Sequence, residues 1–79
     1  MTNIPVGVKG RILNEGEAEP YVLVQDDVYN TGGYLVLTSD TWDFTSNNGH
    51  DYWVLKDELE DFFQEAMWQI DWLINHAML

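Results

Sequence analysis

Apolar and polar residues alternate along four short segments in the first two-thirds of the chain. In the first of them, Val6, Val8 and Ile12 are interleaved with other residues, and the later ones are rich in β-branched and aromatic side chains. A period of two residues is that of a half-buried β-strand. The sequence therefore predicts four strands within residues 4–55, at residues 6–13, 21–25, 34–38 and 51–55.

The connections between these segments consist of turn-forming residues. Acidic residues and Pro20 fill residues 14–20, Gly32 and Gly33 close the second connection, and Asn48-Gly49 lies near the end of the third. Short connections favour antiparallel pairing, because parallel strands need a crossover of a dozen or more residues. We therefore expect a mainly antiparallel four-stranded meander.

The period becomes helical after residue 56. Asp57 and Glu60 have the spacing of a capping box, and neither Gly nor Pro follows them. One face of the expected helix collects the apolar residues Leu59, Phe62, Phe63, Ala66, Met67, Ile70, Leu73, Ile74 and Ala77. The sequence predicts one helix over residues 57–77 that packs across one face of the sheet. Residues 1–79 should thus form a single two-layer α+β domain.

The chain is strongly acidic. Fourteen Asp and Glu residues against three Lys and Arg give a net charge of −11. Phosphate groups are bound through clusters of basic residues, so neither direct nucleic-acid binding nor docking to an anionic membrane is expected. A basic protein is the favoured partner. The absence of a signal-peptide pattern and of a long apolar run predicts a cytoplasmic protein.

A second stripe follows the outward face of the expected helix. At about 100° per residue, Asp61, Glu65, Trp68 and Trp72 share one side, away from the apolar face. Two large indoles left in water are unexpected, because burying them is favourable. Three accounts stay open: cover by the chain's own N-terminal segment or a loop, self-association, or an interface with another protein. Interface hot spots are enriched in Trp, and flanking carboxylates attract a basic partner.

The loop of residues 39–49 repeats this chemistry. Asp40, Trp42, Asp43 and Phe44 interleave acidic and aromatic side chains. These aromatic residues either fold back over an open end of the sheet or point outward. In the second case, the loop and the helix could form one acidic-aromatic surface. We take Asp61, Glu65, Trp68 and Trp72 as the first candidates for partner contact, and Asp40, Trp42 and Asp43 as the second.

Catalytic chemistry is poorly represented. There is no cysteine, and neither His50 nor His76 has a suitably placed base or orienting partner in the sequence. Gly32-Gly33 precedes a strand, unlike a phosphate-binding loop. The acidic turns lack the spacing of a calcium-binding EF-hand. We therefore expect a protein without enzymatic activity, cofactor or metal.

Four stretches of the chain carry a resemblance to a known class. They are Tyr-Val-Leu-Val-Gln-Asp-Asp (21–27), Thr-Gly-Gly-Tyr-Leu-Val-Leu (31–37), Asp-Tyr-Trp-Val-Leu (51–55) and Leu-Glu-Asp-Phe-Phe (59–63). In size, charge and order of elements, the chain resembles the small acidic immunity proteins of bacterial polymorphic and contact-dependent toxin systems. The resemblance implies a cytoplasmic inhibitor that binds one toxin domain, such as a nuclease with a basic surface.

Two other functions remain open. An acidic DNA mimic that inhibits a restriction or other host-defence protein would share the charge, but it needs carboxylates spaced like backbone phosphates. A homodimeric structural module would hide its tryptophans between two copies. The protein is expected to be a monomer or a homodimer.

Overall fold

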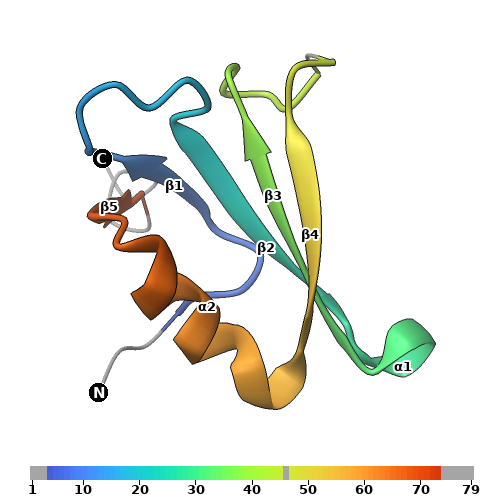
Figure 1. The fold of residues 1–79 in the computed structure, drawn as a ribbon. Coiled ribbons are helices and arrows are strands. Elements are labelled where there is room, and N and C mark those ends of the chain that lie inside the picture. Colours follow the sequence, from blue (N-terminus) through green and yellow to red (C-terminus); the bar gives the residue numbers. More distant parts are fainter. Residues whose placement is uncertain (1–3, 46, 74–79) are drawn as a thin grey trace.

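The computed structural model describes residues 4–45 and 47–73, which form a five-stranded antiparallel sheet with one short helix packed on it (Figure 1). The strand order is β4-β3-β2-β1-β5. The strands are β1 (Lys9–Ile12), β2 (Tyr21–Asp27), β3 (Gly33–Ser39), β4 (His50–Leu55) and β5 (Ile70–Trp72). The helical segments are α1 (Val28–Thr31), the 3-10 turn η1 (Lys56–Glu58) and α2 (Leu59–Ala66).

The α+β class and the first four strands are confirmed. All neighbouring strands pair antiparallel, as the short connections predict. Val24 of β2 lies opposite Val36 of β3, and both are fully buried. Because side chains alternate across a sheet, this register places the buried valines on one face, toward α2. The core consists of Ile12, Val22, Val24, Val36, Val54, Leu59 and Phe63.

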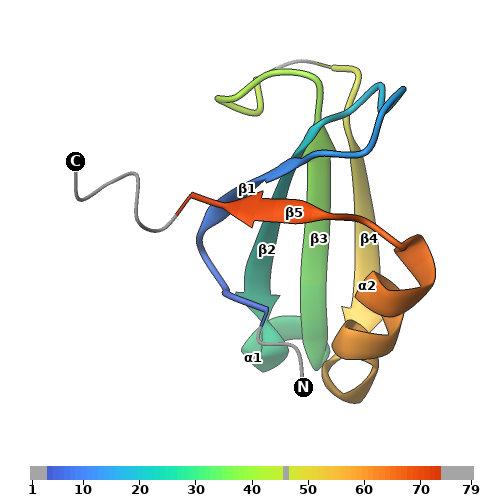
Figure 2. The same cartoon turned by 90° about the vertical axis from the view of Figure 1, so that its left-hand side faces the viewer.

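The sheet is strongly curved. In Figure 2, β5 runs across β2 and β3 instead of along them, and α2 lies beside the lower part of β4. Leu59 and Phe63 are the two buried residues of α2 and pack against the sheet valines. The expected packing of a helix against one face of the sheet is therefore confirmed for this short helix.

The prediction of one helix over residues 57–77 is wrong beyond residue 66. Regular helix covers only Leu59–Ala66, and Met67 adopts a left-handed conformation with φ 57° that ends it. The chain then forms β5, which pairs antiparallel with β1 and adds the fifth strand. Residues 74–77 of the predicted helix lie outside the described residues.

Two long-range partners explain why the helix ends there. The side chain of Asn14 accepts a hydrogen bond from the Gln69 N–H at 2.8 Å and donates one to the Met67 carbonyl at 3.1 Å. Next to this turn, the Leu13 N–H donates to the Gln69 carbonyl at 2.7 Å. The backbone groups that leave the helix thus find partners on β1 and the residues after it, which offsets the cost of a left-handed non-glycine residue.

None of the helices in the described part of the chain has the length and apolar character that a membrane crossing requires.

Candidate binding surface

The four residues of the predicted helical stripe lie on three different elements. Asp61 and Glu65 are exposed on α2, whereas Trp68 follows the turn after the helix and Trp72 belongs to β5. The expected continuous stripe on one helix face is therefore wrong. Its physical cause is the left-handed turn at Met67, which changes the direction of the chain between the carboxylates and the indoles.

Trp68 and Trp72 pack within the protein's own aromatic cluster. The ring of Phe63 lies 5.7 Å from that of Trp68 and 6.0 Å from that of Trp72, measured between centroids. Phe62 also meets Trp68 edge to face. Both indoles are half-buried against the core. Of the three accounts, the structure supports cover within the chain, supplied by neighbouring aromatic residues and by Ile4.

A groove separates α2 from the edge strand β4. It encloses about 380 Å³, and its lining consists of Trp53, Val54, Leu55, Glu58, Asp61, Phe62 and Glu65. The acidic half of the predicted site, Asp61 and Glu65, thus does lie beside aromatic side chains. The indole involved is Trp53, which is 49% exposed and was not among the predicted contact residues.

A second groove lies on the other side of α2. It encloses about 450 Å³ and is mainly apolar. Its lining consists of Ile4, Glu60, Phe63, Gln64, Met67, Trp68, Ile70 and Trp72. Trp68 and Trp72 therefore keep one accessible side, although they also support the core.

The segment between these grooves is a ridge of carboxylates. We call Asp57, Glu58, Glu60, Asp61 and Glu65 the acidic ridge; all are exposed except Glu60, which is half-buried. Within residues 4–45 and 47–73, no ion pair neutralises any of them. Like charges at this density repel one another, and a cationic partner would relieve the repulsion.

The second group of predicted contact residues lies far from the ridge. Figures 1 and 2 both place the β3–β4 loop at one end of the long strands and α2 toward the other. Trp42 folds back, edge to face with Tyr21 at 5.7 Å, and the Lys9 ammonium lies 4.7 Å from its centroid. Phe44 lies 5.6 Å from the same ammonium. The loop and the helix therefore do not form one acidic-aromatic surface.

The acidic residues of this loop serve its own structure. Asp43 accepts hydrogen bonds from the backbone and the hydroxyl of Thr45, and the hydroxyl contact is the main cause that lowers the pKa of Asp43. Asp40 accepts a hydrogen bond from the Asn48 side chain at 3.1 Å. Both carboxylates therefore accept hydrogen bonds that help to fix the shape of the loop.

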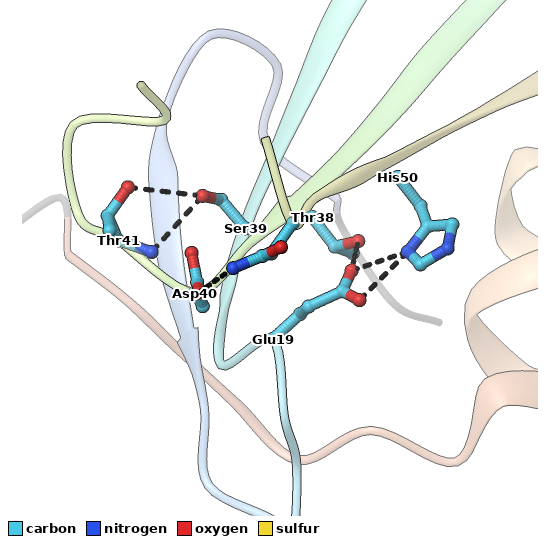
Figure 3. Close-up of polar contacts among 7 residues, drawn as sticks. Glu19, Thr38, Ser39, Asp40, Thr41 and His50 are labelled. Carbon is cyan, nitrogen blue, oxygen red and sulfur yellow. Dashed lines mark hydrogen bonds and ion pairs between the residues drawn. The ribbon is translucent and has the colours of Figure 1, made fainter. Parts of the chain in front are cut away.

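A histidine–carboxylate pair joins the β1–β2 loop to β4 (Figure 3), and no local spacing of residues indicates it. His50 Nδ1 lies 2.8 Å from both carboxylate oxygens of Glu19, and the Thr38 hydroxyl donates to Glu19 at 2.6 Å. The Thr38 contact, followed by the His50 contact, lowers the pKa of Glu19, and Glu19 raises the pKa of His50. The Thr38 hydroxyl thus donates to the carboxylate and not to the imidazole. The pair ties the β1–β2 loop to the start of β4.

This pair predicts a pH-dependent contribution to stability. Because the pKa of His50 is raised, protonated His50 stabilises the fold below the ordinary pKa of 6.5. This stabilisation is lost as the pH rises through the folded-state pKa. Because the pKa of Glu19 is lowered, ionised Glu19 stabilises the fold above the ordinary pKa of 4.5. This stabilisation is lost as the pH falls through the folded-state pKa. The stability difference between wild type and His50→Gln should therefore be greatest near about pH 5.5 and small above about pH 8.5. Urea unfolding at both pH values measures it.

The effect should be small, because the His50 side chain is 61% exposed and solvent screens the pair. Glu19→Gln is the matched variant, and it should remove the same pH dependence. An equal stability difference at both pH values would show that His50 contributes only by packing against Tyr52.

Comparisons with known proteins leave the family open: no protein-family model matches the sequence, and neither the curated proteins nor the solved structures give a match. Within the described residues, no cluster of three or more His, Cys, Asp and Glu side chains has a metal-binding arrangement. The acidic ridge and the two grooves beside it form the candidate binding surface.

Proposed function

We propose that the protein is a non-catalytic inhibitor, of the immunity-protein kind, that neutralises a basic partner such as a toxin nuclease. The observation that carries the proposal is the acidic ridge, whose carboxylates have no cationic partner in the described residues and flank a groove with an exposed tryptophan. Carboxylates of this kind accelerate association with a cationic surface, and an indole that becomes buried slows dissociation.

The proposed contact set differs from the one expected from the sequence. Asp61 and Glu65 keep their place, and Trp53 takes the anchoring role expected of Trp68 and Trp72. Because Trp68 and Trp72 stabilise the aromatic cluster around Phe63, replacing them would disturb folding as well as binding. Trp53 is better suited to a test, since it lies on the exposed edge strand.

Neutralising the ridge should weaken binding. The partner for the test is a catalytically inactivated form of the protein encoded by the neighbouring open reading frame. Calorimetry measures the affinity, and stopped-flow fluorescence measures the association and dissociation rates. We expect Asp61→Asn with Glu65→Gln to lower the association rate by about tenfold or more at low salt. The difference should shrink as salt screens the charges.

The matched control is Glu15→Gln with Glu17→Gln, which removes two carboxylates from the β1–β2 loop at the other end of the strands (Figure 1). If this control slows association as much as the ridge variant does, net charge and not the ridge governs binding. If Trp53→Ala leaves the dissociation rate unchanged while salt abolishes binding, the DNA-mimic alternative gains support, since that mode depends on charge alone.

A further inference from the structure

The outer edge of β4 is an open hydrogen-bonding edge. In the described chain, β4 is the last strand of the sheet and pairs only with β3. Five of its six residues are exposed, and Tyr52, Trp53 and Leu55 are large and apolar. Edge strands are usually protected by Lys, Pro, bulges or shortness. Residues 50–55 contain neither Lys nor Pro, and their one carboxylate, Asp51, would attract a basic strand and repel an acidic one.

The backbone direction identifies the groups on that edge. A Cβ atom placed on Gly33 would collide with the Val54 carbonyl oxygen, so this carbonyl points toward β3. Antiparallel residues alternate between facing the partner strand and facing away from it. The N–H and C=O groups of Asp51, Trp53 and Leu55 therefore point to the open side.

The groove between β4 and α2 continues this edge. The open side of Trp53 and Leu55 leads into the groove of about 380 Å³, whose other wall carries Glu58, Asp61 and Glu65. An extended segment that paired with β4 would thus bring alternate side chains within reach of three carboxylates. Lysine or arginine at those positions would be complementary to this wall in charge and length.

We infer that the β4 edge binds an extended basic segment of the partner by strand addition, with its Lys or Arg side chains directed to the acidic ridge. The partner's basic character rests on the proposed function, and the hydrogen-bonding edge is an independent observation. A second copy of this chain would bring a further charge of −11 to the same edge, which disfavours pairing between two β4 strands. Strand addition draws its affinity from main-chain hydrogen bonds and its specificity from alternate side chains.

A pair of synthetic peptides tests strand addition separately from charge. The first alternates Lys and Val over about seven residues, and the second carries Pro in place of its central Val. Both have the same charge, but proline removes an N–H and disfavours a paired strand. We expect the first peptide to bind about tenfold more tightly. It should also slow the exchange of the Asp51, Trp53 and Leu55 amide protons.

A pair of protein variants tests the edge itself. Asp51→Pro and Asp51→Ala both remove the exposed carboxylate, and both leave the hydrogen bonds to β3 intact. Only the proline variant also removes the outward N–H. We expect Asp51→Pro to bind the alternating peptide about tenfold more weakly than Asp51→Ala. Far-ultraviolet circular dichroism of both variants confirms that the fold is retained.

Three results would overturn strand addition: equal binding of the two peptides, equal binding by the two variants, or protection of the β4 amides by self-association without peptide. Equal binding that still falls with Asp61→Asn and Glu65→Gln would leave the proposed function in place, because charge alone would then hold the partner. If Asp61→Asn with Glu65→Gln bound the partner as fast as the wild type does, the proposed function would instead be wrong.

Discussion

Replacing Phe63 with Ala is expected to lower the free energy of unfolding by about 3–5 kcal/mol. Phe63 is 9% exposed and lies at the centre of the aromatic cluster, in contact with Phe62, Trp68 and Trp72. Removing its ring leaves a cavity between α2 and β5 that the rigid indoles cannot fill. Because small domains have total stabilities of about 5–15 kcal/mol, this loss is a large fraction of the stability of the protein.

Urea unfolding followed by circular dichroism measures this loss, and the melting temperature should fall by more than about 10 °C. Gln64→Ala is the matched control, since Gln64 is the exposed neighbour on the same helix and should change stability by less than about 0.5 kcal/mol. Phe63→Leu should lose less than Phe63→Ala, because it retains most of the buried area. A loss below about 1 kcal/mol for Phe63→Ala would show that the aromatic cluster does not hold α2 to the sheet.

The four strands of the meander could be predicted because their signal is local. The alternation that includes Val22, Val24 and Val36 indicates which face of each strand is buried. This pattern does not depend on which strand is the neighbour in the sheet. The connections are short enough to leave one simple topology. Only the ends differ, by a few residues at most in the last three strands.

Residues 66–73 could not be assigned in the same way, because they fit two periods. Ala66, Met67, Ile70 and Leu73 follow helical spacing, whereas Trp68, Ile70 and Trp72 alternate with Gln69 and Asp71 as in a strand. The choice depends on the free edge of β1 and on the side chain of Asn14, more than fifty residues away. The pattern of residues 66–73 itself holds no information about either.

The candidate site was predictable in charge but not in position. The carboxylates of residues 57–65 are evident from the sequence, and the structure gathers Glu58, Asp61 and Glu65 along one groove. The aromatic residues beside them depend on how the chain turns at η1, which sets Trp53 and Phe62 at the same groove. The Glu19–His50 pair joins residues 31 positions apart, so no local spacing could indicate it.

One local signal for β5 was present in the sequence. Gly10 interrupts the first strand, and glycine inside a strand often marks a close approach by another part of the chain. In the structure Gly10 pairs with Trp72, and the indole lies over the position where a Cβ atom would be. The missing side chain of Gly10 therefore leaves the space that Ile70 and Trp72 of β5 occupy.

Gly10→Ala is expected to displace β5 from the sheet at a cost of about 1–3 kcal/mol. The new Cβ atom would lie 2.7 Å from both Ile70 Cγ2 and Trp72 Cε3, well inside van der Waals contact. Neither atom can move without shifting the strand, because the indole is rigid and also packs on Phe63. The overlap falls on β5 alone, so the loss should begin there and not in the meander.

Amide hydrogen exchange distinguishes this local effect from global unfolding. In Gly10→Ala, the Leu13 and Leu73 amides should exchange faster, since they donate to the Gln69 and Lys9 carbonyls across β1 and β5. The Val24 and Val36 amides of the central strands should keep their relative protection. Arg11→Ala is the comparison variant, because it places an alanine on the opposite, exposed face of β1 and leaves the space above Gly10 unchanged.

A double-mutant cycle with Trp72→Ala completes the test. In that background the ring atoms are gone, so Gly10→Ala should cost at least about 0.5 kcal/mol less than it does in the wild type. Equal costs in the two backgrounds would show that the indole does not occupy the space above Gly10. Uniformly faster exchange in all five strands would mean that β5 and the meander unfold as one unit, and that the last strand is as essential to the fold as the first four.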